Sequence, residues 1–249
     1  MNWRRSRRAS AKPVLLIRPP RSAKITSWRD LSELVDLCER QGKWIFRGEH
    51  HDPENPRPLL PTIGRPDGRK GAPYRRLDEI HLLKAFRRRA RPLVGHEPVS
   101  DLEWLAIAQH HGLPTRLLDW TENLLAAAFF ASSAMNTRWG LIYAVRDLRA
   151  VSRADELNPF KRTGRPGIYR PPHISPRIPA QSGIFTWHPR PTSLFRPANL
   201  HVWVIPPLVC SRIKFVLDST GINKASLFPD LDGLAEGLRW RHKWDRQPR

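Results

Sequence analysis

The stretch QHHGLPTRLLDWTEN, at residues 109–123, holds the densest set of side chains that could do chemistry. It lies between two apolar segments, LEWLAIA and LLAAAFFA, so its polar groups come from a part of the chain that must enter the core. His110 and His111 are adjacent and cannot easily serve one site; we expect one to be a core histidine, while the other could act as a general acid or base, because an imidazole titrates near neutral pH. Asp119 and Thr121 precede an apolar helix, where free backbone N–H groups favour a cap or an anion.

Two arginines are candidates for binding an anion, since a guanidinium can engage a phosphate or carboxylate with two hydrogen bonds. Arg116 lies in the polar stretch, and Arg47 ends the segment WIFR before Gly48, which allows a close approach to the backbone. The sequence leaves alternatives open. Arg47 could be an exposed strand-end residue or the partner of Glu49 or Asp119, and Asp119 could be a helix cap or the partner of Arg116.

A third polar cluster, RIPAQSGIFTWH, contains Gln181, which could bind a ligand amide or a backbone group. We expect the backbone, because most side-chain hydrogen bonds go to backbone or water. Asp230 and Asp232 stand in the turn FPDLDG, where carboxylates more often cap the next helix than catalyse. No group of His, Cys, Asp and Glu has a metal-ligand spacing, so no metal is predicted.

The 249-residue chain has a net charge of +20 and a sequence pI of about 11.3. Such a charge predicts attraction to nucleic acid through a basic surface, although scattered arginines also fit a compositional bias. No apolar run approaches the roughly 20 residues that span a bilayer, and the N-terminal VLLI is too short for a signal peptide. We therefore expect no membrane association and a cytoplasmic location; a protein partner stays unknown.

Hydrophobic periodicity and punctuation residues predict the elements. Ser27 is a candidate N-cap of a first helix that Gly42 closes, and Ser100 or Asp101 starts another that Gly112 stops. Helices come first and strands later, with no βαβ alternation, which predicts an α+β fold. The remaining expectations are a flexible basic arm at 1–24, a strand at 43–49, a loop at 50–73, helices at 77–90 and 122–134, strands at 140–145, 182–187, 201–207 and 212–217, an irregular stretch at 152–180, and a turn with a short helix at 227–244.

Four segments together resemble the FRG domain family: WIFRGE, LEWLAIAQHHGLPTRLLDWTENLLAAAFFA, RIPAQSGIFTWH and SLFPDLDGLAEGL. They occur in order between about residues 25 and 240, which predicts one FRG domain followed by a basic tail at 241–249. The family takes its name from the triplet that begins at Phe46. Some members look like parts of bacterial anti-phage defence or toxin loci, and this resemblance implies such a setting.

A weaker resemblance is to ADP-ribosyltransferases of the arginine-first type. Arg47 matches their first element, an aromatic-Arg-Gly triplet; Asp119-Trp120-Thr121 before AAFFA could occupy their Ser-Thr-Ser position, and Gln181-Ser182-Gly183 their Glu-x-Glu position. Two of the three Ser-Thr-Ser residues differ, and both glutamates are missing. This resemblance implies N-terminal helices packed on a mostly antiparallel, split sheet.

It also implies NAD as the cofactor and an active or degenerate enzyme. The catalytic candidates are Arg47, Glu49, His110, Asp119 and Thr121, and the cofactor-binding candidates are Arg47, Gly48, Arg116, Trp120 and Gln181. Two other functions stay open. One is a basic nucleic-acid-binding module, and the other is a non-catalytic interaction domain in which the same arginines and Asp119 form a buried network.

Overall fold

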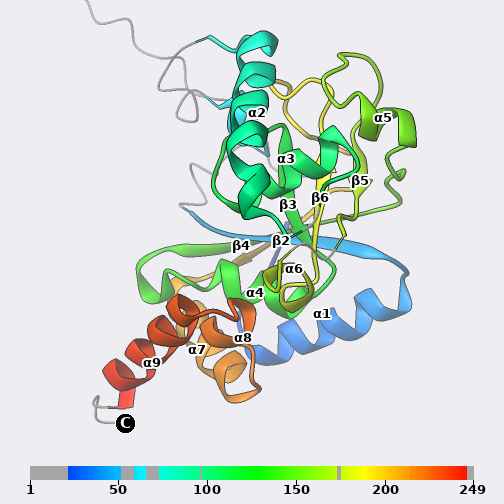
Figure 1. Cartoon of the computed structure of the whole chain (residues 1–249). Helices are drawn as coiled ribbons and strands as arrows, with labels where there is room; N and C mark the ends of the chain where they lie inside the picture. The colour runs from blue at the N-terminus through cyan, green and yellow to red at the C-terminus, as the bar shows by residue number, and fades with distance from the viewer. Residues whose placement is uncertain (1–21, 52–58, 66–72, 96, 173–174, 246–249) are drawn as a thin grey trace, which may run out of the picture.

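The computed structural model describes residues 22–51, 59–65, 73–95, 97–172 and 175–245 (Figure 1). Most of the expected arm, parts of the expected loop at 50–73 and the last four residues of the expected tail lie outside this part of the chain. Its centre is a seven-stranded sheet of order β1-β7-β4-β2-β3-β6-β5. The strands are β1 (Ser22–Lys24), β2 (Trp44–His51), β3 (Leu117–Thr121), β4 (Trp139–Arg146), β5 (Gly167–Tyr169), β6 (Gly183–Trp187) and β7 (His201–Ile205).

All strand pairs in this sheet except β1 with β7 are antiparallel, which confirms the predicted mostly antiparallel sheet. Helices cover it on two sides: α2 and α3 lie on one side of β2 and β4, and α1, α4, α7, α8 and α9 lie on the other (Figure 1). The helices are α1 (Trp28–Arg40), α2 (Arg76–Ala90), α3 (Asp101–His110), α4 (Leu124–Ala131), α5 (Arg153–Leu157), α6 (Arg177–Ala180), α7 (Pro207–Ser219), α8 (Lys224–Leu227) and α9 (Leu231–Asp245).

Three of the predicted helix ends, at Ser27, Ser100 and Gly112, are confirmed. The Ser27 side chain accepts from the N–H of Asp30 and forms a capping box, and the Ser100 side chain accepts from the N–H of Glu103. Gly112 follows α3 with a φ of 83°, a conformation that glycine adopts without strain. Local side-chain chemistry therefore sets where these helices begin and end.

Several expectations about element type and order are wrong. Helices and strands alternate along the chain rather than forming two blocks. Residues 212–217, expected as a strand, lie in α7, because Pro207 begins a helix and Ile213 and Leu217 then fall one turn apart on its buried side. The expected arm contributes β1 beside β7, and the expected irregular stretch holds α5, β5 and α6.

The largest correction concerns the polar stretch itself. Residues 117–121, expected as a loop leading into a helix, form β3, whose backbone pairs along its whole length with β6. Asp119 and Thr121 are therefore strand residues. Asn123 is the N-cap of α4 instead, and its Oδ1 accepts from the N–H groups of Leu125 and Ala126.

Strand β2 has extensive backbone pairing with one neighbouring strand and little with the other. This strand pairs with β4 through eight residues but meets β3 at a single register pair, Phe46 with Thr121. Helix α4 presses on β2 at the same place, because a Cβ added to Gly48 would lie 1.8 Å from the carbonyl oxygen of Ala127. Gly48 thus provides the close approach expected of it, and the group that approaches is α4. Beyond Phe46, side chains rather than a backbone ladder connect β2 to β3.

Candidate functional site

Arg47 joins the two halves of the sheet where the backbone ladder between β2 and β3 stops. Its Nη1 donates a hydrogen bond to the carbonyl oxygen of Asp119 at 2.7 Å and lies 3.6 Å from Oδ2 of the same residue. The guanidinium therefore takes the place of a strand-to-strand hydrogen bond. This contact brings together two residues that the sequence singled out, 72 positions apart.

Glu49, on the same face of β2, is the second partner of Arg47. Nε and Nη2 of Arg47 both donate to its Oε1, the former at 2.8 Å, and the Glu49 side chain is only 11% exposed. Burial by itself would raise the pKa of Glu49, but the adjacent Arg47 outweighs it and holds that pKa below its ordinary value. Oε2 of Glu49 is buried and has no hydrogen-bond partner among the described residues.

Asp119 is the accessible carboxylate of the group, with 59% of its side chain exposed. Gln109, in the last turn of α3, donates from Nε2 to Oδ2 of Asp119 at 3.0 Å and accepts from the hydroxyl of Thr115 at 2.7 Å. The carboxylate is thus held by donors on two sides while it faces solvent. Sequence reasoning missed Gln109, although this residue opens the polar stretch and ends a helix beside two histidines.

Thr121 and Gln181 fasten β3 to the segments next to it. The Thr121 hydroxyl donates to the carbonyl oxygen of Gln181 at 2.6 Å and accepts from the N–H of Asn123 at 2.9 Å. The Gln181 side chain donates to the carbonyl oxygen of Leu227 at 2.9 Å, which confirms the expected backbone partner. Both residues hold the end of β3 in place.

His110 lies half-buried at the end of α3, with Nε2 at 3.0 Å from the hydroxyl of Ser175. Burial lowers the pKa of His110, and the neighbouring His111 and Arg177 lower it further. The imidazole is therefore neutral near pH 7 and can accept a proton. The negative charges of Asp119 and Asp230 act on this pKa in the opposite direction.

The two carboxylates of the FPDLDG turn have different places. Oδ1 of Asp230 accepts from the N–H of Gly233 at 2.8 Å, which confirms the predicted helix cap, and its Oδ2 accepts from Nε of Arg177 at 2.9 Å. Asp232 is exposed in the first turn of α9. Neither carboxylate contacts Arg47.

Arg116 lies in a separate, fully buried cluster. It donates to both oxygens of Glu79, at 2.9 and 2.7 Å, to the hydroxyl of Tyr74 at 3.0 Å and to the carbonyl oxygen of Pro159 at 2.7 Å. With its charge paired and its donors used, it has the contacts of a structural ion pair. The expectation that Arg116 adjoins Asp119 is corrected here. Its partner is Glu79 of α2. The sequence held one signal that Glu79 is buried, because Glu79 lies one turn before the buried Leu83.

Trp120 also faces away from the group around Arg47 and Asp119. Its side chain is buried, and its indole N–H donates to the hydroxyl of Thr186 at 2.9 Å. We therefore do not propose Trp120 or Arg116 as ligand-binding residues. The structure does bring together Arg47, Glu49 and Asp119, with Thr121 later on the same strand.

The fold and these contacts define a mixed α/β protein with an Arg–Asp pair across a divided sheet, in which the carboxylate of Asp119 is exposed. The family model of the FRG domain matches residues 42–138, so the chain carries an FRG domain. This match spans β2, α3, β3 and α4, the elements that supply the site. No curated protein and no solved structure matches the chain. The extension of the domain from 25 to 240 stays a prediction.

The described residues also bear on a metal site and on a membrane-spanning helix. Among the residues with described placement, no three His, Cys, Asp or Glu side chains gather as a metal site would require. No helix in the same part of the chain has the length and apolar character needed to cross a membrane.

Proposed function

We propose that this FRG domain binds NAD at the divided edge between β2 and β3 and transfers its ADP-ribose to an acceptor. The observation that carries the proposal is the exposed carboxylate of Asp119, held between Arg47 and Gln109. Such a group supplies both negative charge and fixed geometry, which are what a glycosyl-transfer site needs.

Arg47 supports the binding of the diphosphate or a ribose. Its hydrogen bonds to described residues use one N–H on each of its three nitrogens, and a guanidinium has five N–H donors. Two donors therefore stay available for a ligand oxygen. Glu49 holds the guanidinium in a fixed orientation, so little side-chain entropy is lost when an anion binds.

Asp119 supports the chemistry that the missing glutamates perform in the enzymes this chain resembles. In transfer from NAD, the bond between C1′ of the ribose and nicotinamide breaks, and nicotinamide leaves with the bonding electrons. The sugar carbon becomes positively charged, and a nearby carboxylate stabilises that charge. The acceptor then bonds to C1′ and loses a proton, and we assign His110 as the base that accepts it.

The experiment is to incubate the purified chain with NAD and measure both binding, by calorimetry, and nicotinamide release, by chromatography. We expect Asp119→Asn to lower nicotinamide release by about 100-fold or more, because it removes the charge that stabilises the transition state. Asp232→Asn, a change of the same chemistry at an exposed position of α9, serves as the matched control and should leave release unchanged.

Binding of NAD without release would mean that the domain keeps the cofactor site of a degenerate transferase. Arg47→Lys, which keeps the charge but loses the forked geometry, should then weaken binding about tenfold. A wild-type chain that neither binds NAD nor releases nicotinamide would overturn the proposal.

A further inference from the structure

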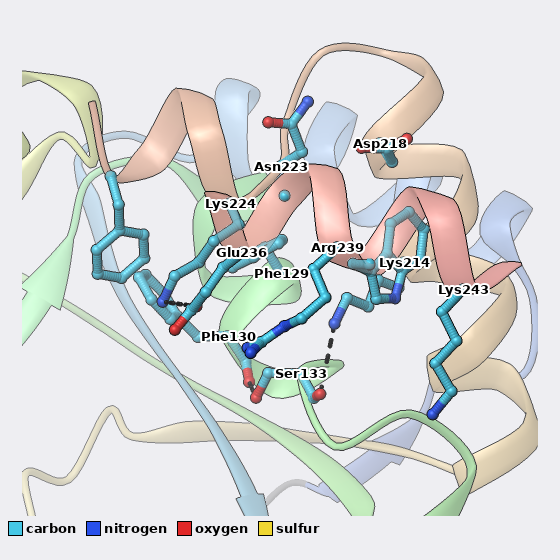
Figure 2. Close-up of a pocket in the computed structure, with 13 residues that line it drawn as sticks. Phe129, Phe130, Ser133, Lys214, Asp218, Asn223, Lys224, Glu236, Arg239 and Lys243 are labelled. Atoms are coloured by element: carbon cyan, nitrogen blue, oxygen red, sulfur yellow. Dashed lines mark hydrogen bonds and ion pairs between the residues drawn. The ribbon is translucent and has the colours of Figure 1, made fainter. Parts of the chain in front are cut away.

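A cavity lies between α4, α7, α8 and α9, and none of the residues that line it belongs to the site around Arg47. It is an open groove with a volume of about 620 Å³ (Figure 2). Its lining combines aromatic rings with lysine and arginine side chains, a composition that sets it apart from an ordinary packing defect.

The aromatic wall comes from α4, which supplies Phe129 and Phe130, and from Phe228, which directly follows α8. Phe130 and Phe228 meet edge to face, with ring centroids 6.1 Å apart, and Phe129 packs against Phe130 at 5.7 Å. Phe130, Phe228 and Trp240 are each only partly buried. Nζ of Lys224 lies 3.7 Å from the centroid of Phe228 and Nζ of Lys214 lies 5.4 Å from that of Trp240, whereas no described cation lies over the ring of Phe130. A partly exposed ring that no cation covers is a stacking platform for flat aromatic groups such as nucleobases.

The charges of the groove do not cancel. Both carboxylates in its lining are already engaged: Glu236 with Lys224 at 3.0 Å and Asp218 with Arg241 at 3.1 Å. Three cations of the lining form no salt bridge to a described carboxylate. They are Lys214, Arg239 and Lys243. Figure 2 shows Arg239 and Lys243 extending from α9 on either side of the amine of Lys214.

Lys214 is the most confined of these cations. Its Nζ lies 5.8 Å from the centroid of Phe129 and 5.4 Å from that of Trp240, and donates to the carbonyl oxygen of Ser133 at 3.5 Å. Burial lowers the pKa of Lys214, and the nearby Lys224 lowers it further. An anion in the groove would stabilise this ammonium, so the geometry favours a negatively charged ligand over a neutral one.

We infer that the groove binds single-stranded nucleic acid, with a base on the ring of Phe130 and phosphates on Arg239, Lys243 and Lys214. Stacking and phosphate contacts in one open groove are the usual means of binding single strands without sequence preference. The net charge of +20 draws a polyanion to the protein, and the groove supplies the local contacts. This inference is independent of the NAD proposal.

The test is fluorescence anisotropy with a labelled 12-nucleotide oligothymidylate at 0.05, 0.15 and 0.3 M NaCl. We expect the double change Arg239→Gln/Lys243→Gln to weaken binding about tenfold or more at 0.15 M salt and to lower the salt slope by about two. The matched control, Arg88→Gln/Arg89→Gln, removes the same charge from exposed positions of α2 and should weaken binding less than about threefold.

A second variant tests stacking without changing charge. Phe130→Leu keeps an apolar side chain but removes the ring, and should weaken binding about fivefold or more if a base stacks there. Asp119→Asn should leave oligonucleotide binding unchanged, which separates this inference from the NAD site. Equal losses in the two double variants, or full affinity in Phe130→Leu, would overturn it. So would a polyglutamate peptide that competes as well as the oligonucleotide.

Discussion

Arg47 and Arg116 are two arginines of one domain that each pair with a glutamate, yet their surroundings differ in kind. Arg116 is completely buried, and its guanidinium is enclosed by Glu79, Tyr74 and backbone carbonyls. Arg47 is partly accessible and lies 3.6 Å from a carboxylate that faces solvent. A paired arginine is thus structural when its partners close around it, and available for function when one of them stays exposed.

The strongest test of this difference is to remove each guanidinium in turn. Arg116→Met leaves Glu79 buried without its partner, so we expect a loss of about 3–5 kcal/mol in the free energy of unfolding. Arg47→Met also leaves a glutamate without its partner, but Glu49 is 11% exposed whereas Glu79 is 1% exposed, and Asp119 faces solvent, so the loss should be smaller. Urea denaturation followed by fluorescence measures both. Similar losses for the two variants would show that the two arginines have the same role.

Acid should destabilise the region around Arg116 through His188, whose backbone N–H donates to the Arg116 carbonyl oxygen. Burial, and then Arg116, lowers the pKa of His188 from 6.5 to about 3. Between pH 6.5 and 3, the unfolded chain therefore binds a proton at His188 and the folded chain does not. The free energy of unfolding falls as the pH drops through this range.

Between pH 6.5 and 4.5 the wild-type chain should lose about 2–3 kcal/mol more than His188→Gln, at about 1.4 kcal/mol for each pH unit. Urea titrations at the two pH values measure this difference. His242→Gln, at an exposed position of α9, should follow the wild type. The same pH dependence in all three proteins would contradict the assignment to His188.

The packing beside Arg47 provides a smaller effect. Gly48→Ala places a methyl group against the carbonyl oxygen of Ala127, so α4 must move away from β2 at a cost of about 1–3 kcal/mol. A Cβ on Gly95 meets nothing within 4 Å, which makes Gly95→Ala the control. Thermal unfolding compares the two, and an unchanged midpoint for Gly48→Ala would mean that the helix does not press on this strand.

The smallest expected change in stability belongs to Asp119. Because its side chain is largely exposed, Asp119→Asn should alter the free energy of unfolding by less than about 1 kcal/mol. The same variant should abolish most nicotinamide release if the domain is a transferase. A large loss of stability in urea denaturation would place Asp119 with the structural residues and remove the contrast with Arg116.

The sequence by itself determined the features that depend on near neighbours. Ser27 and Ser100 cap helices because each hydroxyl bonds an N–H three residues further along, and Gly112 ends α3 because its own φ is positive. The alternation of Trp44 and Phe46 with Ile45 and Arg47 likewise follows from the pleat of one strand. Family resemblance added that the segments holding Arg47 and Asp119 belong to one domain.

Only the tertiary structure decided which partners the polar residues have. Glu79 is 37 residues from Arg116, and Asp119 is 72 residues from Arg47, so no local pattern specifies either pair. The same is true of residues 117–121, which form a strand because β6 is there to pair with them. Long-range pairing depends on how strands and helices pack as a whole. It is decided by the sum of many contacts, each of which contributes only a small free energy, so the residues next to Arg47 or Arg116 in the sequence do not reveal its partner.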